Sequence, residues 1–384
     1  MNMGNESEST FADSHGRRSR IYFELATESD DLELRQFLSS IRMEGIISVS
    51  FRREPSYFSA HELEGDFIQV LTARDRDTRK IVGMGSRSIR ERYVASYPRQ
   101  IGYLSGLRIH PDYRGGTMLA RGYRYLRELD LDRRADFYVT TIAVENEIAT
   151  KALLQGRAGL PFYKNIGRLN TWIVPKKKRA KFSSAVKIES IDPSKIEELM
   201  QFLARVRTEK ELLPKYAAKD FMFPSSIFAG MQCGDLYGMW IDDELVGTLG
   251  IWDQRSIKQF VVERYQWWFH WLRPLYNASA RISGRVRFPQ PGSCLPLVTA
   301  ALPLAIGKGK HYYSNLVDEV TSQLPDDIDA IMIGLCDSDP LTGTIRERAV
   351  ENYQTDIFLV SWEEEILETA WKSGAIPYLE LGAL

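Results

Sequence analysis

Cysteine is scarce in this chain of 384 residues: Cys233, Cys294 and Cys336 are its three cysteines, and none belongs to a Cys-x-x-Cys pair. An odd number of widely separated cysteines argues against a disulfide framework and against a structural zinc site. The pattern favours a reducing compartment, so we expect a cytoplasmic protein without a bound metal.

An excess of charge of one sign is also missing. The chain has 50 Lys and Arg residues against 51 Asp and Glu residues, which gives a formal net charge of −1. It therefore lacks the overall positive charge with which proteins hold phosphate backbones or anionic lipids. From this balance we expect neither nucleic acid nor a membrane as a partner.

No apolar run is long enough to cross a bilayer. The longest aromatic and apolar stretch, residues 260–275, is interrupted by Glu263, Arg264, His270 and Arg273. The first twenty residues are polar and charged, and they contain no stretch that a secretory pathway would recognise. We expect residues 1–19 to form a flexible tail.

The length and composition indicate two globular domains. A chain of 384 residues exceeds what one hydrophobic core usually supports, and 44% hydrophobic with 26% charged residues is typical of folded proteins. A basic run without apolar periodicity follows Pro175, and in a chain of balanced charge a solvated linker explains it better than a nucleic-acid-binding arm. We expect a first domain at 20–175, a linker at 176–182 and a second domain at 183–384.

The first domain alternates strand and helix patterns in a definite order. Runs rich in β-forming residues predict strands at 22–25, 67–73, 81–88, 100–109, 137–144 and 162–174. Apolar residues at helical spacing predict helices that begin near Asp30, Met118 and Asn146. These elements indicate an α+β domain built on a mixed sheet.

A glycine turn joins strand 100–109 to the next helix. Pro111 ends the strand, and Gly115 and Gly116 precede the helix at Met118. The amide N–H groups at a helix N-terminus bind phosphate oxygens, and glycine lets the backbone approach a ligand closely. The turn therefore predicts a phosphate site, although most Gly-Gly pairs before helices are simply turns.

In order and in sequence, these elements resemble the GNAT superfamily of N-acetyltransferases over residues 20–175. In that family, a strand ending in Val/Ile-x-Pro-x-Tyr-Arg-Gly leads into the loop that binds the coenzyme A pyrophosphate. Here the run is Ile109-His110-Pro111-Asp112-Tyr113-Arg114-Gly115-Gly116-Thr117-Met118-Leu119. A second family signature, Asn-x-x-Ala-x-x-Leu/Ala-Tyr, is matched by Asn146, Ala149, Ala152 and Leu153. The resemblance implies an α+β fold of two tandem GNAT-like domains, each a mixed, mostly antiparallel, twisted sheet flanked by helices.

The resemblance also implies a reaction. Acetyl-CoA, or another acyl-CoA, would be the co-substrate, and a small-molecule or peptide amine would attack its thioester directly. The acyl carbonyl would lie in the splay between strands 104–109 and 137–144. A homodimer is one possible assembly. The residues implied to bind the coenzyme are Leu107 and Ile109, through their backbone amides, and Arg114, Gly115, Gly116, Thr117, Met118 and Asn146.

Three positions depart from the family pattern. Thr117 and Leu119 stand where the loop usually has glycines, and Leu153 stands where a tyrosine often protonates the departing thiolate. Leucine cannot donate a proton, so we take Tyr163 as the substitute acid. An aromatic residue at the start of a strand is, however, more often part of the core.

Charged residues outside these motifs are candidates for proton transfer and acceptor binding. No carboxylate lies on strand 101–109, so Glu145, at the end of the central strand, is the candidate base. A solvated strand-end charge is the simpler interpretation of this residue. The loop 50–58 occupies the place of the family's acceptor wall, where Arg52 and Arg53 would suit an anionic acceptor and Glu54 a cationic one.

The second half repeats the order of elements but not the sequence. Strand patterns at 186–191, 236–241, 244–252, 295–306 and 330–336 alternate with helix patterns that begin near Ser194 and Lys310. No Asn-x-x-Ala signature follows the last of these strands. We expect a degenerate copy that shapes the acceptor pocket or an interface, with phosphate binding at Lys308 and Gly309 as the less favoured alternative.

An aromatic cluster lies in one insertion of the second half, at Trp267, Trp268, Phe269 and Trp271. A packed core is the first interpretation of such a cluster, and a lid over an aromatic or acyl ligand is the second.

Three functions follow, in order of preference. The first is an acyl-CoA-dependent N-acyltransferase. The second, suggested by Thr117, Leu119 and Leu153, is a catalytically silent acyl-CoA-binding regulatory or scaffold protein. The third is a tandem-fold aminoacyl or fatty-acyl transferase for a larger substrate, which the chain length permits but no motif selects.

Overall fold

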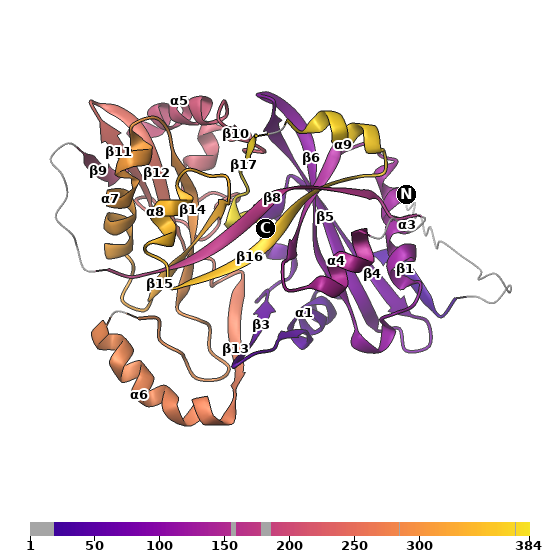
Figure 1. The fold of residues 1–384 in the computed structure, drawn as a ribbon. Helices are drawn as coiled ribbons and strands as arrows, with labels where there is room; N and C mark the ends of the chain where they lie inside the picture. The colour runs from indigo at the N-terminus through magenta and orange to yellow at the C-terminus, as the bar shows by residue number, and fades with distance from the viewer. Residues whose placement is uncertain (1–18, 155–158, 178–185, 284, 373) are drawn as a thin grey trace.

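Strands from both halves of the chain build one sheet. The computed structural model describes residues 19–154, 159–177, 186–283, 285–372 and 374–384. The first half supplies β1 (Ile21–Leu25), β4 (Phe67–Asp75), β5 (Ile81–Val94), β6 (Tyr97–Ile109), β7 (Phe137–Ala143) and β8 (Phe162–Pro175). The second half supplies β9 (Lys187–Ser190), β11 (Leu236–Ile241), β12 (Glu244–Trp252), β14 (Leu297–Ala305), β15 (Ala330–Cys336) and β16 (Glu351–Ser361). Their order in the sheet is β1-β4-β5-β6-β7-β16-β8-β15-β14-β12-β11-β9 (Figure 1).

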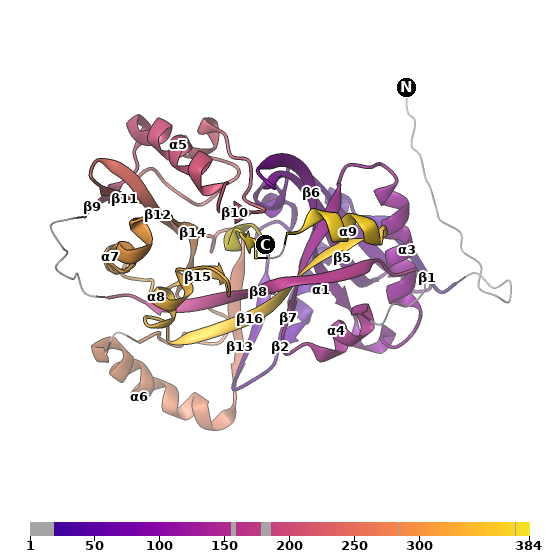
Figure 2. The ribbon, with the colours of Figure 1, turned by 45° about the horizontal axis from the view of Figure 1, so that its top comes forward.

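The two halves exchange their last strands. β8 closes the first half in sequence, yet it lies between β16 and β15 of the second half, and β16 lies between β7 and β8. Figure 2 shows β8 and β16 running side by side across the middle of the molecule. Each half therefore completes its sheet with a strand from the other, and separating the halves would leave β7 and β15 as unpaired edges.

The pairing is mostly antiparallel, and the same arrangement occurs twice. Within the large sheet, the parallel neighbours are β6 with β7 and β14 with β15. The first pair is in register from Ile101↔Phe137 to Tyr103↔Val139, and the second from Leu297↔Ala330 to Thr299↔Met332. The expected α+β fold, with two copies of a mixed and mostly antiparallel sheet, is confirmed.

The helices that begin at Asp31, Met118, Glu147, Ile196 and Gly309 start close to where the apolar periodicity predicts them, whereas the other helices were not predicted. The first half contains α1 (Asp31–Ser40), α2 (His61–Glu64), α3 (Met118–Asp130) and α4 (Glu147–Leu154). The second half contains α5 (Ile196–Val206), α6 (Trp267–Ser283), α7 (Gly309–Ser322), α8 (Thr342–Arg346) and α9 (Glu364–Ala370). α3 packs Met118, Tyr123 and Leu126 into a core that also holds Phe358 and Val360 of β16. The exchanged strand thus belongs to the core of the first half.

A separate three-stranded sheet joins the halves a second time. In it, β13 (Gln259–Tyr265) pairs with β3 (Ile47–Arg52), which pairs with β2 (Arg42–Met43). The expectation of a loop over residues 50–58 is therefore wrong for its first residues. The partner strand lies in the other half of the sequence, so the pairing leaves no local signal. A further short pair, β10 (Lys210–Glu211) with β17 (Ile376–Pro377), is parallel.

The tryptophan cluster does not form a packed core. Its residues lie on α6, where 79% of Trp267 and 76% of Trp271 are exposed. In this group Phe269 packs inward, with its ring centroid 5.2 Å from that of Phe288. The first interpretation is wrong because α6 lies beside β13 at the edge of the molecule instead of covering the large sheet (Figures 1 and 2).

Most of the expected tail and linker lies outside the described residues. Of the basic run, Lys176 and Lys177 are described, and their ammonium groups pair with Asp326 and Asp318 at 3.0 and 3.4 Å. Across the described ranges, no helix combines the length and the apolar character needed to cross a bilayer.

Candidate functional site

The strands β6 and β7 diverge at the centre of the first half. Their pairing stops after Tyr103 and Val139. Beyond this point two side-chain bonds still link the strands: Thr140 Oγ1 donates to the backbone oxygen of Leu104 at 2.8 Å, and Thr141 Oγ1 lies 2.8 Å from the Tyr103 hydroxyl. The splay expected between these strands is therefore present.

A bulge in β6 faces the same gap. Ser105 lies opposite Ser86 on β5, but Arg108 lies opposite Met84, so β6 accommodates one extra residue. Gly106 takes up the irregularity with a φ of +64°, a conformation that favours glycine. The bulge interrupts the ladder and frees backbone groups that would otherwise be paired across it.

A cavity of about 860 Å³ occupies the gap. Its walls come from β4, β5, β6, β7, α3, α4 and also β16 of the second half. The lining residues that matter below are Ser86, Ser105, Leu107, Arg108, Ile109, Met118, Leu119, Tyr123, Glu145, Asn146, Leu153 and Tyr353. The second half thus contributes directly to this cavity.

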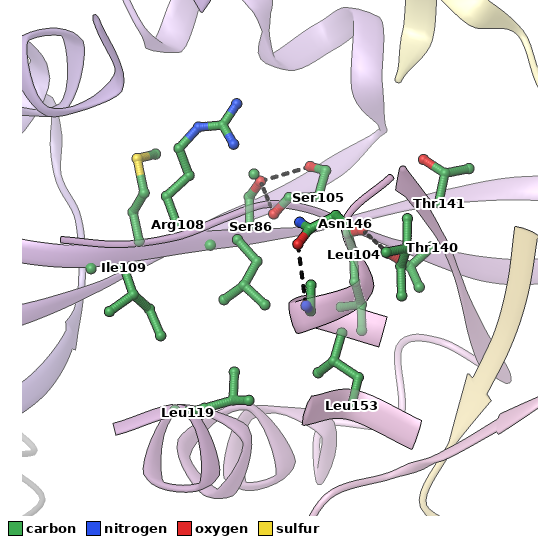
Figure 3. A pocket seen from close by; sticks show the side chains of 18 of the residues that line it. Ser86, Leu104, Ser105, Arg108, Ile109, Leu119, Thr140, Thr141, Asn146 and Leu153 are labelled. Carbon is green, nitrogen blue, oxygen red and sulfur yellow. Dashed lines mark hydrogen bonds between the residues drawn. The ribbon is translucent and has the colours of Figure 1, made fainter. Parts of the chain in front are cut away.

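The cavity has an apolar side and a polar side. Figure 3 shows the side chains of Leu119 and Leu153 on one side of β6, where Ile109 also points. Arg108 extends to the opposite side, the side on which Ser86 and Ser105 share a hydrogen bond of 2.9 Å. Burial lowers the pKa of the Arg108 guanidinium, and its buried Nε has no hydrogen-bond partner among the described residues. An apolar group of a ligand would therefore bind on one side of β6, and an anionic or hydrogen-bonding group would bind on the other side.

The predicted phosphate turn lies beside the cavity rather than in its wall. Of its residues, Met118 lines the cavity, whereas Arg114, Gly115, Gly116 and Thr117 are exposed next to it. A Cβ atom built on either glycine would meet no other atom within 4 Å, so the space in front of the turn is open. The Thr117 side chain makes no capping hydrogen bond, which leaves first-turn N–H groups of α3 available to a ligand.

Glu145 and Asn146 lie where β7 gives way to α4. Both line the cavity and both are exposed. Asn146 Oδ1 accepts a hydrogen bond from the Ala149 amide at 3.2 Å, so the asparagine caps α4. Burial raises the pKa of Tyr353, which also lines the cavity, and the negative charge of Glu145 raises it further.

Tyr163 lies behind the cavity wall. Its hydroxyl is 2.7 Å from that of Tyr123, and of the two residues it is Tyr123 that lines the cavity. Burial raises the pKa of Tyr123 to about 12, and burial raises that of Tyr163 as well, with a further contribution from Tyr123. Sequence analysis missed Tyr123 because its helical spacing on α3 indicates only a core position. Phe162, which precedes Tyr163 on β8, is 46% exposed and does not belong to the core.

The charges of the expected acceptor wall are already paired. Arg52 binds Glu263 at 2.6 Å, Arg53 is buried against Glu64, and Glu54 is paired with Arg35. Lys258 also approaches Glu64, at 3.5 Å, and donates to the backbone oxygen of Leu384, a residue that lines the cavity, at 2.9 Å. Burial lowers the pKa of Lys258 to about 8. Arg108, which the sequence did not single out, is the cation that lines the cavity wall.

The second copy contains an equivalent bulge. On β14, Ala301 lies opposite Gly250 and Leu304 opposite Thr248, so Leu302 corresponds to Gly106. Leu302 also has a positive φ, of +48°. The parallel pairings give the same correspondence. The pairing of β14 with β15 stops after Thr299, three residues before Leu302, and the pairing of β6 with β7 stops after Tyr103, three residues before Gly106.

The C-terminal segment fills the second splay. The carboxylate of Glu380 accepts hydrogen bonds from the Leu302 amide at 3.1 Å and from the Tyr378 hydroxyl at 2.5 Å. Leu381 packs over β15, where a Cβ on Gly334 would lie 2.9 Å from it. The second copy thus holds a buried carboxylate at the position where the first copy has its open cavity.

The second helix start is closed as well. A Cβ on Gly309, at the beginning of α7, would lie 2.3 Å from the backbone oxygen of Val246. The helix therefore packs directly on β12 at Gly309, in contrast to the open space in front of Gly115 and Gly116. The closure is confined to Gly309, because a Cβ on Gly307, earlier in the turn, would meet no atom within 4 Å.

The buried Glu380 predicts a pH dependence of stability. Burial raises its pKa to about 7, well above the ordinary value of 4.5. The folded state then binds more protons than the unfolded state between these values, so stability falls as pH rises through the window and stays lower above it. A pKa shift of this size corresponds to about 3 kcal/mol of unfolding free energy. Between about pH 5 and pH 8 we therefore expect Glu380→Gln to lose less stability than the parent, by at least about 1 kcal/mol. Denaturant unfolding of parent and variant at both pH values measures this, and equal losses in the two proteins would refute the assignment.

In the described part of the chain, no group of three or more His, Cys, Asp or Glu side chains is placed to hold a metal ion.

Comparison with known proteins shows a relationship in structure only. No protein-family model matches the sequence, and no curated protein matches it. Saccharomyces cerevisiae N-myristoyltransferase with bound myristoyl-CoA superposes with a TM-score of 0.59 at 9% identity, over 94% of this chain and 81% of that one. The GCN5-related glucosamine N-acetyltransferase region of a fungal multi-domain GH3 β-N-acetylglucosaminidase gives 0.57 at 12% identity, over 89% of this chain and 38% of that one. The chain therefore has the tandem GNAT-like fold, with a degenerate second copy.

Proposed function

We propose that this protein transfers an acetyl or other acyl group from acyl-CoA to an amine. The observation that carries the proposal is the contrast between the two copies. The first has an open cavity between splayed strands beside an open glycine turn, whereas the second has the same bulge but is filled by Glu380 and Leu381. The similarity to proteins that bind myristoyl-CoA or acetylate glucosamine supports the same chemistry.

The coenzyme would lie along the first copy in a definite direction. Its pyrophosphate would meet the turn at Gly115 and Gly116 and the N-terminus of α3, where amide N–H groups and the helix dipole favour negative charge. The acyl group would pass between the apolar side chains of Leu119 and Leu153.

The bulge in β6 would hold the acyl carbonyl. The second copy indicates how, because the amide of Leu302, the counterpart of Gly106, donates to a carboxylate oxygen of Glu380. We take this oxygen as a mark of where the acyl oxygen would lie in the first copy. The donors proposed from the sequence, the amides of Leu107 and Ile109, are on the same strand segment. Such donors stabilise the negative charge that develops on the oxygen in the transition state.

Two proton transfers complete the reaction. The neutral amine attacks the thioester carbon, and its excess proton would pass to Glu145 directly or through water. The carbon–sulfur bond then breaks, and the thiolate takes up a proton. Tyr123 would supply it, because its hydroxyl lines the cavity and remains protonated at neutral pH, and Tyr163 would stand behind it as its hydrogen-bond partner.

Release of free coenzyme A thiol tests the proposal. The protein is mixed with acetyl-CoA and, in separate reactions, with amines that carry a carboxylate, a phosphate or no anionic group. We expect amine-dependent thiol release, with a preference for anionic amines because the buried Nε of Arg108 on the polar side has no hydrogen-bond partner among the described residues. Binding of acetyl-CoA without release for any amine would instead favour the second candidate, a silent acyl-CoA-binding protein. Thr117, Leu119 and Leu153, at positions where the family has glycines and a tyrosine, are the residues that favour this candidate.

A further inference from the structure

The outer side of α6 is a continuous apolar face. It consists of Trp267, Trp268, Trp271, Leu272 and Leu275, which we call the tryptophan face. Trp267, Trp271 and Leu275 recur every four residues and are 79%, 76% and 72% exposed. Three large side chains exposed to this degree on successive turns of one helix are unusual for a surface without a partner.

This exposure does not arise from a badly packed helix. The opposite side of α6 is anchored by aromatic contacts, since the ring of Phe269 lies 5.5 Å from that of Tyr265 and 5.2 Å from that of Phe288. The ring of Tyr276 lies 5.0 Å from that of Phe288, and Ala280 is buried. The fold therefore holds α6 in place while leaving the tryptophan face outside.

The surroundings of the tryptophan face extend its apolar character. Ile46, 51% exposed, is adjacent to the start of α6, because its backbone oxygen accepts from the Gln266 amide at 3.0 Å. Figures 1 and 2 both place α6 at the outer edge of the molecule, clear of the large sheet. At this edge the face is open to a partner outside the molecule.

The segment around α6 is locally basic although the whole chain is neutral. Between Glu263 and Asp318 the sequence has no Asp or Glu, and residues 264–287 contain five arginines, at 264, 273, 281, 285 and 287. Arg264 and Arg287 are paired, with Glu44 at 2.9 Å and with Asp329 at 2.6 Å. Arg273 lies over the ring of Tyr265, with 5.6 Å between guanidinium and ring centre, and Arg285 is exposed.

We propose that α6 docks the tryptophan face onto an anionic lipid bilayer. Helices that lie in the membrane interface combine a wide apolar face rich in Trp and Leu with flanking arginines, and α6 has both features over 17 residues. Tryptophan favours the headgroup region because its ring is apolar and its indole N–H is polar. The sequence-based expectation of no membrane partner depends on the net charge of the whole chain. A net charge does not reveal a local group of arginines and exposed apolar side chains confined to one helix and its flanks.

Docking in this way would bring one end of the cavity to the bilayer. Met43 and Glu44 line the cavity, and Glu44 is the residue that pairs with Arg264 immediately before α6. If the cavity performs acyl transfer as proposed, lipid-bound acyl chains or acceptors would be close to it. The docking itself depends only on the tryptophan face and its charge, so it can hold even if acyl transfer fails.

Vesicle co-sedimentation tests the docking. The full-length protein is mixed with vesicles of phosphatidylcholine alone or of phosphatidylcholine with phosphatidylserine. We expect binding to the anionic vesicles that weakens with added salt, and at least about tenfold weaker binding for the triple variant Trp267→Ser, Trp271→Ser and Leu275→Ser. The matched control replaces Leu131 and Ile148, 77% and 83% exposed on the first half, by serine and should bind as the parent does. A thermal unfolding midpoint equal to that of the parent confirms that each variant is folded.

Three results would overturn the proposal. One is absence of binding to anionic vesicles by the parent. Another is equal binding by the parent and the folded triple variant, or equal binding to both kinds of vesicle. The third is a dimer of the parent in solution that the triple variant abolishes, without any vesicle binding, because the face would then be a contact between two copies of the chain. Thiol release from acetyl-CoA, measured without vesicles, reports on acyl transfer separately.

Discussion

Replacing Gly116 with glutamate is expected to weaken acetyl-CoA binding by a factor of about a hundred or more, or about 2.7 kcal/mol. The new side chain would enter the open space in front of the turn, where no atom lies within 4 Å of a built Cβ, so the fold has room for it. Its carboxylate would oppose the pyrophosphate, and two like charges about 4 Å apart near a protein surface repel by about 4 kcal/mol. Calorimetric titration with acetyl-CoA measures the loss.

The control places a glutamate at the helix start of the second copy. Lys308 is the N-cap residue of α7, as Thr117 is that of α3, and its side chain is exposed and paired with Asp242 at 2.9 Å. Lys308→Glu should leave acetyl-CoA affinity unchanged, because α7 packs on β12 at Gly309 and the second splay is filled by Glu380 and Leu381. Unaltered affinity in Gly116→Glu, or a comparable loss in Lys308→Glu, would remove the glycine turn of the first copy from the site.

Replacing Glu145 with glutamine is expected to lower turnover by a factor of about a hundred or more, the usual effect of removing a positioned acid or base. The carboxylate lies on the cavity wall, to which Tyr353 also belongs, and the bulged strand β6 itself has no carboxylate. Glutamine keeps the size and polarity of the side chain but cannot accept the proton of the amine. Affinity for acetyl-CoA should remain that of the parent, so the loss should appear in the rate of thiol release alone.

The pH profile and a neighbouring variant separate catalysis from general electrostatics. Activity of the parent should rise with pH, because most acceptor amines are protonated at neutral pH and only the neutral amine attacks. Glu147→Gln removes another exposed charge two residues along the chain, which pairs with Lys151 at 2.8 Å and does not line the cavity. It should behave as the parent does. A Glu145→Gln variant with parental turnover at every pH would show that Glu145 is only a strand-end charge.

Much of the first copy could be predicted from the sequence because its signals are local. The strand that ends before Pro111, the glycine turn and the helix from Met118 each depend on neighbouring residues, and the splay after Tyr103 was implied by the resemblance to the GNAT superfamily. For the same reason Asn146 was identified at the start of α4, where its side chain caps the helix. The order of strands repeated in the second half indicated the second copy without any sequence similarity.

The parts that escaped prediction depend on pairs distant in sequence. The exchange of β8 and β16 and the pairing of β3 with β13 join residues from opposite halves, and no periodicity records such partners. The same holds for Tyr353, which reaches the cavity only because β16 lies beside β7. The closing of the second splay by Glu380 follows from the path of the C-terminal segment.

Side-chain roles were predicted less well than backbone elements. Tyr123 and Tyr163 both have the spacing of core residues, and only the structure shows which of them lines the cavity. Arg108 looks like any exposed charge on an alternating strand, but the bulge at Gly106 changes the register and turns its side chain to the polar side. The exposed face of α6 was misjudged because an aromatic cluster is usually buried, and the sequence does not show which layer of the fold it joins.

The stoichiometry of acetyl-CoA binding tests the central claim most directly. The contrast between an open first copy and a second copy filled by Glu380 and Leu381 predicts one bound coenzyme per chain in a calorimetric titration, and none in Gly116→Glu at concentrations that saturate the parent. Two bound coenzymes per chain, or one that survives in Gly116→Glu, would contradict the assignment of the first copy as the sole coenzyme site. No binding at all would contradict the proposed function itself.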